Sequence, residues 1–190
     1  MFVLVTGGAS SGKSAFAERV ACALPAPHAY LATMQGAGEE AAARIERHRA
    51  LRAGKGFETV ECPCGLERLA LDGVLPEQGT VLLEDLGNLA ANEMFAEHPR
   101  TADEAMAGID AVARQCANLV IVTNEIGSDG IDYGDATRAD QEFLGALACA
   151  CAARADAVFE VVASLPRVIK ADRTGEACLD SFLEGGDAQC

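Results

Sequence analysis

The sequence FVLVTGGASSGKS, residues 2–14, decides the fold class of this chain. Its opening residues, Phe2–Thr6, are apolar or β-branched and predict a buried strand. An alanine-rich helical stretch runs from Gly12 to Leu24, where a proline follows. Between strand and helix lies a complete G-x-x-x-x-G-K-[ST] motif. This order distinguishes a phosphate-binding P-loop from an ordinary glycine-rich turn, which is the alternative interpretation.

The chemistry of a P-loop explains the spacing of its residues. Glycines let the loop curl so that backbone N–H groups point inward, and the helix that follows adds a partial positive charge at its first turn. We expect Lys13 to reach the β- and γ-phosphates of a purine nucleotide, and the Ser14 hydroxyl to coordinate Mg²⁺. The predicted nucleotide-binding residues of the loop are contiguous: Gly7, Gly8, Ala9, Ser10, Ser11, Gly12, Lys13 and Ser14.

The rest of the chain alternates short apolar runs with alanine-rich helical stretches, which is typical of a parallel sheet with crossover helices. Further strands are predicted at 28–32, 57–60, 80–83, 119–123, 157–162 and 168–170. Helices are predicted at 39–53, 101–117 and 135–154. We therefore expect an α/β fold of the P-loop NTPase-like class, a mostly parallel sheet flanked by helices. It should form one domain over residues 1–170, followed by a loose, polar C-terminal tail over 171–190.

Composition limits the function classes. Of 190 residues, 50% are hydrophobic, and the formal net charge is −14. A chain of this size buries about 70% of its unfolded surface and can form a core without disulfides or metal ions. The acidic excess argues against nucleic-acid binding. The longest apolar segment, 144–153, is too short to span a membrane, and no targeting segment is visible, so we expect a cytoplasmic protein.

The eight cysteines do not form a recognisable metal or disulfide pattern. No C-x-x-C pair occurs, and no combination of cysteine and histidine has the spacing of a zinc site. We therefore expect most of them to be reduced, small, buried side chains without disulfides.

Polar residues follow two of the predicted buried strands. Glu84 and Asp85 come directly after one strand, and either could serve the metal or a nucleotide hydroxyl. The alternative is a pair of solvated acids at a strand end. Asn124 and Glu125 follow another strand, where ligands of open α/β sheets gather, although loop entry also favours asparagine.

The segment 39–53 carries a basic face. Arg44, His48 and Arg52 have i, i+4, i+8 spacing, which places them on one side of a helix. Such a face could bind a second polyanion, with His48 as base or nucleophile. The alternative is a solvated basic face on an acidic protein. The other two histidines, His28 and His98, are expected to be structural or solvent-exposed.

Residues 1 to about 170 resemble a known family. The resemblance is carried by VTGGASSGKS, LATMQ, ARIERHRALRAGKGFETVE, VLLEDLGNLAANEMF, VIVTNEIG and AARADAVFEVVASLPRVIK. These segments resemble the bifunctional adenosylcobinamide kinase/adenosylcobinamide-phosphate guanylyltransferases of cobalamin synthesis. The P-loop alone is unspecific. The histidine-bearing helix followed by FETVE, together with TNEIG, is far more specific.

The resemblance implies two activities at one site. The family phosphorylates the aminopropanol hydroxyl of the corrinoid adenosylcobinamide with ATP or GTP. It then transfers GMP from GTP to that phosphate through a guanylylated histidine, which corresponds here to His48. It is also known as a homotrimer. Besides the P-loop, the positions that match its nucleotide contacts are Thr33, Met34, Gln35, Arg49, Ala50, Leu51, Arg52, Glu61 and Glu84.

The chain departs from the family at several positions. Ser10 stands where the family usually has Arg, Phe57 where it has Trp, and Ala53 where Pro is common. The stretch 129–142 is acidic where a basic helix start is common. Two other functions remain as alternatives: a P-loop kinase of another small alcohol, which does not need His48, and a nucleotide-binding module without transfer chemistry.

Overall fold

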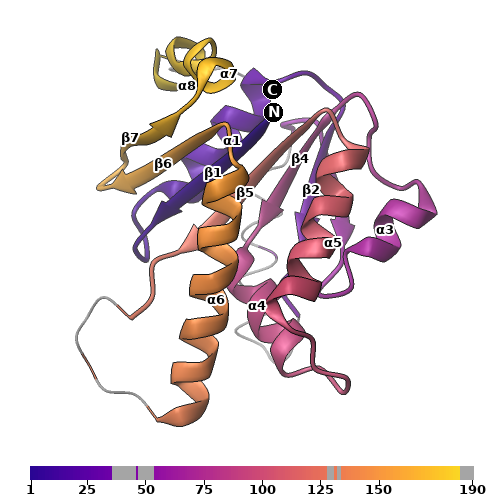
Figure 1. Ribbon diagram of the computed structural model, residues 1–190. Coiled ribbons are helices and arrows are strands. Elements are labelled where there is room, and N and C mark those ends of the chain that lie inside the picture. Colours follow the sequence, from indigo (N-terminus) through magenta and orange to yellow (C-terminus); the bar gives the residue numbers. More distant parts are fainter. Residues whose placement is uncertain (36–45, 47–53, 128–130, 132–133, 185–190) are drawn as a thin grey trace.

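The computed structural model describes residues 1–35, 46, 54–127, 131 and 134–184 (Figure 1). Its strands form a seven-stranded sheet in the order β3-β2-β4-β5-β1-β6-β7, in which only the pairing of β7 with β6 is antiparallel. The strands are β1 Phe2–Gly7, β2 His28–Ala32, β3 Phe57–Glu61, β4 Thr80–Glu84, β5 Asn118–Asn124, β6 Ala157–Val162 and β7 Leu165–Ala171.

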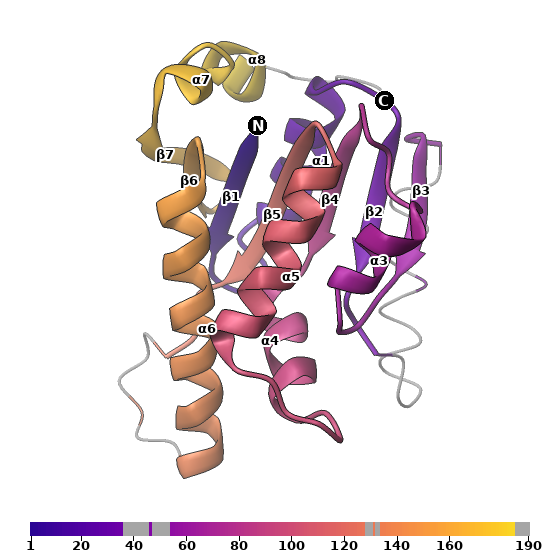
Figure 2. The ribbon, with the colours of Figure 1, turned by 45° about the vertical axis from the view of Figure 1, so that its right-hand side comes forward.

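Helices cover both faces of this sheet (Figures 1 and 2). They are α1 Lys13–Ala23, α3 Glu67–Asp72, α4 Leu86–Met94, α5 Ala102–Gln115, α6 Asp135–Arg154, α7 Arg173–Glu176 and α8 Leu179–Glu184. α4, α5 and α6 pack on one face, whereas α1 and α8 pack on the other. Among the described residues, no helix has the length and apolarity needed to cross a bilayer.

Alternation along the central strands supplies a core to each face. In β1, Val3 and Val5 pack toward α1, and Leu4 packs toward the opposite helices. All three are at most 3% exposed. Because both faces are covered, the strand is apolar from Phe2 to Val5, and each such side chain contributes roughly 1.5–3 kcal/mol by burial. The sequence pattern that predicted the strand is therefore a direct consequence of its place in the sheet.

The expected α/β architecture is confirmed. Every predicted strand is present, with ends that differ by a few residues, and so are the predicted helices that correspond to α1, α5 and α6. The predicted helix 39–53 lies outside the described residues except at position 46. The short helix α3 and the site-forming helix α4 were not predicted.

The expectation of a loose C-terminal tail is wrong for residues 173–184. They form α7 and α8, and Phe182 of α8 is 1% exposed. Its ring meets Phe159 of β6 edge-on, with 6.1 Å between the ring centroids. The segment is polar overall, so its sequence did not indicate that Phe182 joins the hydrophobic core on the α1 face of the sheet.

The expectation for the cysteines is met only in part: most of the described ones are reduced, but only Cys116 and Cys151 of the free thiols are buried. Cys22 is disulfide-bonded, so the expectation of no disulfide is wrong at this residue. Cys62, Cys64, Cys116, Cys149, Cys151 and Cys178 are free thiols. Burial raises the pKa of the Cys151 thiol to about 12, which makes it a poor nucleophile and an ordinary core residue.

Candidate functional site

The predicted site residues that the structure describes gather at the carboxyl edge of the sheet. In register, Gly7 of β1 lies beside Asn124 of β5, and Glu84 of β4 lies beside Ala32 of β2, which in turn pairs with Glu61 of β3. The chain leaves β1 toward α1 on one face and leaves β5 toward α6 on the other. Such a reversal between neighbouring strands opens a crevice in which α/β proteins bind ligands.

The loop between β1 and α1 has the geometry of an anion cradle. Its backbone takes positive φ at Ser10 (57°) and at Gly12 (90°), and α1 begins directly afterwards. Lys13 is 7% exposed, and its Nζ donates to the Gly8 carbonyl oxygen at 3.1 Å. Ala9 and Ser10 are exposed at the tip of the loop. An ammonium and a helix N-terminus thus converge on one small region, which suits a polyphosphate.

The turn between β6 and β7 supports the loop from behind. Its two residues, Ala163 and Ser164, both have positive φ, and the Ser164 N–H donates to the Ser11 carbonyl oxygen at 2.7 Å. A Cβ on Gly12 would lie 2.6 Å from the Ser164 Oγ. This contact was not predicted from the sequence, because the turn lacks the Asn, Asp or Gly that usually indicates positive φ.

The first glycine of the motif is required by a close approach to β6. A Cβ at Gly7 would lie 2.6 Å from the Val161 carbonyl oxygen and 2.6 Å from the Ser11 Oγ. We expect Gly7→Ala to lower the free energy of unfolding by about 1–3 kcal/mol through overpacking. Urea unfolding measures this, with Gly8→Ala as the control, since a Cβ there meets nothing within 4 Å. Equal midpoints for the two variants would contradict the assigned role of Gly7.

The two acids at the end of β4 have different partners. Asp85 caps α4: its Oδ1 accepts from the Asn88 N–H at 2.7 Å, and its Oδ2 accepts from the Asn124 Nδ2 at 3.1 Å. Glu84 accepts from the Tyr30 hydroxyl at 3.1 Å. Because Leu82 packs toward α1, alternation places Glu84 on the α1 face of the sheet, which is the face of the P-loop helix.

The nucleotide contacts that the resemblance implies at the ends of β2 and β3 differ in burial. Thr33 is fully buried, and its hydroxyl donates to the Asp85 carbonyl oxygen at 2.8 Å while accepting from the Asp85 N–H at 2.9 Å. Thr33 therefore ties the end of β2 to the end of β4. Met34 is half-buried, whereas Gln35 and Glu61 are exposed at the same edge. Of these four, Thr33 has the best-defined structural task.

The basic segment itself lies largely outside the described residues. This holds for His48, Arg49, Ala50, Leu51 and Arg52, whose assigned roles stay predictions. Directly after the segment, Lys55 forms an ion pair with Glu18, a residue of α1 that is 6% exposed.

The other two histidines are placed as expected. His28 is buried, its Nε2 lies 3.0 Å from the Leu24 carbonyl oxygen, and its ring packs on Phe57. His98 is exposed.

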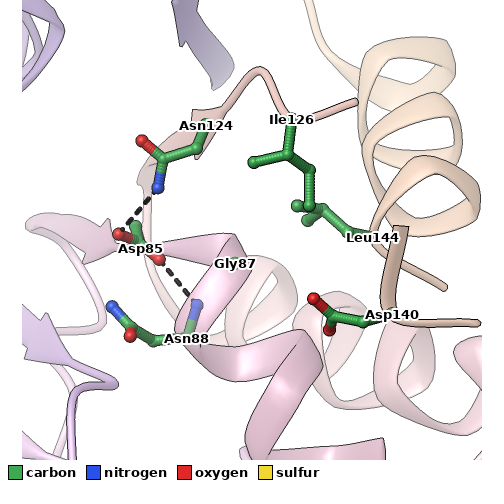
Figure 3. A pocket seen from close by; sticks show the side chains of 7 residues that line it. All are labelled: Asp85, Gly87, Asn88, Asn124, Ile126, Asp140 and Leu144. Atoms are coloured by element: carbon green, nitrogen blue, oxygen red, sulfur yellow. Dashed lines mark hydrogen bonds between the residues drawn. The ribbon is translucent and has the colours of Figure 1, made fainter. Parts of the chain in front are cut away.

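A pocket of about 200 Å³ opens at the same edge, between the ends of β4 and β5 and the helix α6 (Figure 3). Its lining consists of Asp85, Gly87, Asn88, Asn124, Ile126, Asp140 and Leu144. Sequence reasoning placed Asp85 and Asn124 at this edge but missed Asn88 and Gly87, because it did not predict α4. The signal for that helix was present: an aspartate at the cap, followed by Leu86, Leu89 and Ala90 at helical spacing.

Comparison with known proteins identifies the family of this chain. The family model described as cobinamide kinase / cobinamide phosphate guanyltransferase matches residues 3–169. The bifunctional adenosylcobalamin biosynthesis protein CobU of Salmonella typhimurium strain LT2 is 32% identical over 184 residues, which cover 90% of this chain and all of that protein. CobP of Pseudomonas aeruginosa is 33% identical, covering 89% of this chain and 97% of the relative. CobU of Escherichia coli K12 is also 33% identical, covering 90% and 100%. The chain therefore belongs to the cobinamide kinase / cobinamide phosphate guanyltransferase family.

Proposed function

We propose that this protein phosphorylates the aminopropanol hydroxyl of adenosylcobinamide with ATP or GTP, and then transfers GMP from GTP to the new phosphate. The observation that carries the proposal is the buried Lys13 ammonium, folded back over the P-loop at the start of α1. The family match over residues 3–169 supplies the substrate class. Both steps handle the polyphosphate of a purine nucleotide, so one cradle can serve both.

In the kinase step, the hydroxyl oxygen attacks the γ-phosphorus, the bond from that phosphorus to the bridging oxygen breaks, and a nucleoside diphosphate leaves. The hydroxyl proton is released. The work of the protein is to position the reactants and to stabilise negative charge on the phosphate oxygens. Lys13, the loop N–H groups and the first turn of α1 provide that stabilisation.

In the transfer step, the resemblance assigns His48 as nucleophile. An imidazole nitrogen attacks the α-phosphorus of GTP, the bond to the β-phosphate oxygen breaks, and pyrophosphate leaves. The guanylyl group is then held as a phosphoramidate, which is labile enough to pass onward. A phosphate oxygen of the corrinoid product attacks the same phosphorus, and the imidazole is regenerated.

Oxygen donors at the site fit a magnesium ion. We propose the Ser14 hydroxyl and the Glu84 carboxylate as its ligands, since Mg²⁺ is commonly held by one or two carboxylates plus substrate phosphates and waters. Asp85 is the second choice, because its carboxylate caps α4 and accepts from Asn124, whereas Glu84 lies on the face of the sheet that carries the P-loop helix. Within the described residues there is no cluster of three or more acids, histidines or cysteines, as a dedicated metal cage would need. When bound, the ion would neutralise phosphate charge.

Two further expectations concern the cellular location and the assembly, and the second of them rests on the resemblance alone. We propose that the protein works in the cytoplasm and that it assembles as a homotrimer. Light scattering coupled to size-exclusion chromatography measures the second directly, and a monomer or dimer as the dominant species would contradict it.

Product analysis tests the proposed function. Adenosylcobinamide is incubated with ATP alone and, separately, with GTP, and the products are identified by mass spectrometry. We expect adenosylcobinamide phosphate with ATP, and adenosyl-GDP-cobinamide with pyrophosphate when GTP is present. Phosphorylation without GMP transfer would select the alternative of a simple kinase. Nucleotide binding without either product would select a non-catalytic module.

A further inference from the structure

The pocket between β4, β5 and α6, here the β4–β5 pocket, lies next to the P-loop. Asn124, one of its lining residues, pairs in register with Gly7, the first residue of the motif. The Glu125 N–H also donates to the Gly7 carbonyl oxygen at 3.2 Å. Adjacent strands lie about 4.8 Å apart, so a ligand in this pocket sits one strand away from the phosphate loop. A kinase must hold its acceptor hydroxyl close to the γ-phosphate, and this pocket is in a position to do so.

The lining selects against a nucleotide. Two carboxylates, Asp85 and Asp140, face the pocket from opposite walls (Figure 3). Their charge repels phosphate groups and favours a neutral ligand that donates hydrogen bonds. Ile126 and Leu144 supply an apolar side against which methyl or methylene groups can pack.

Asp140 provides an unused acceptor in this pocket. Its Oδ1 is buried, and among the described residues it finds no hydrogen-bond partner. Burial raises the pKa of this carboxyl group. A buried acceptor without a partner is costly, so a ligand that brings an N–H or O–H group to it gains the hydrogen bond that the fold leaves unmade.

The volume limits the part of a substrate that can enter. A pocket of about 200 Å³ is smaller than the roughly 300–1,000 Å³ clefts that enclose a whole drug-sized ligand. It suits a short arm such as an amide-linked hydroxypropyl group, whereas a corrin ring is several times larger. The macrocycle must therefore remain outside while one arm enters.

We propose that the β4–β5 pocket is the acceptor subsite, in which the neutral amide-linked hydroxyalkyl arm lies with an N–H or O–H group donating to the Asp140 Oδ1. This inference rests on the proposed function, because it takes the acceptor alcohol from it. Asp140 is then a binding residue for the acceptor and has no contact with the nucleotide.

Steady-state kinetics separate this role from a structural one. Asp140→Ala is expected to raise the KM for adenosylcobinamide at least about tenfold while leaving the KM for ATP within about twofold, because only the acceptor loses a hydrogen bond to a charged group. Asp140→Asn keeps an acceptor oxygen and is expected to restore the KM to within about threefold of the wild type. Glu142→Ala, an exposed acid on the same helix, is the matched control and should resemble the wild type. An unchanged acceptor KM in Asp140→Ala overturns the inference and leaves the kinase proposal standing.

A binding experiment tests the pocket without turnover. N-Acetyl-1-amino-2-propanol, a neutral fragment with the same groups as the arm, is titrated into the intact protein while the side-chain amide signals of Asn88 and Asn124 are followed by NMR. We expect both signals to shift in the wild type and in Glu142→Ala, and to stay fixed in Asp140→Ala. Fragment binding by a wild type that does not phosphorylate adenosylcobinamide would refute the proposed function and support the pocket. Signals that do not move in the wild type overturn the pocket.

Discussion

Replacing Lys13 by alanine is expected to lower kcat for both phosphorylation and GMP transfer by about 100–1,000-fold, the usual cost of removing one preorganised group that stabilises transition-state charge. Lys13 as a residue is 7% exposed, and its Nζ donates to the Gly8 carbonyl oxygen at 3.1 Å, so the ammonium is held at the P-loop by the fold itself. A cation held in a water-poor site acts on phosphate oxygens far more strongly than one in solvent.

The same variant should fold normally. The lysine side chain leaves α1 at its first residue, and alanine is the best helix former, so the helix keeps its start. Circular dichroism and thermal unfolding check this point before kinetics are compared. The matched control is Lys170→Ala, since the Lys170 Nζ of the edge strand β7 donates to the Ala152 and Ala153 carbonyl oxygens at the end of α6. Wild-type kcat in folded Lys13→Ala would contradict the role assigned to the P-loop.

Lys13→Arg refines the argument. The guanidinium keeps the charge but is larger and planar, so it cannot take the position of the compact ammonium at 3.1 Å from the Gly8 carbonyl oxygen without moving its neighbours. We expect it to recover little activity. Recovery close to wild type would mean that charge alone matters and that the tight placement of Lys13 does not.

The sheet could be predicted from the sequence because its central strands are buried on both faces. In β5, residues 119–122 are buried and apolar without interruption, and that run is visible without a structure. The P-loop was predictable for a related reason: its backbone geometry demands glycines at fixed positions, as the close approach of Gly7 to Val161 shows.

Other parts of the site could not be predicted, because they depend on contacts between segments far apart in the chain. From the sequence, Glu84 and Asp85 were equivalent metal candidates. Their difference arises only when Asn124, 39 residues away, donates to the Asp85 carboxylate. The placement of Asp140 opposite Asp85 likewise needs α6 to pack beside α4. Local sequence indicates helix and strand propensity, but it does not indicate which distant segments come into contact.

His48→Ala is expected to abolish GMP transfer, with a fall of at least roughly ten-thousand-fold, while ATP-dependent phosphorylation of the corrinoid persists. Removing the atom that forms the covalent intermediate eliminates that route entirely, whereas the γ-phosphate transfer needs only the P-loop. Protein incubated with GTP labelled in the α-phosphate should retain the label in an acid-labile, base-stable bond, and His48→Ala should retain none. GTP labelled in the γ-phosphate should leave no label, because pyrophosphate departs.

The chain contains three histidines, so the adduct can be assigned by single variants. His98→Ala is the matched control, because His98 is exposed and should leave labelling unchanged. His28 is a poor site for the adduct, since it is buried between the Leu24 carbonyl and the Phe57 ring. Label retained by His48→Ala would refute the guanylyl-histidine step. Loss of both activities in a folded His48→Ala protein would instead mean that the basic segment also binds the nucleotide for the kinase reaction, and the two steps would then share more than the P-loop.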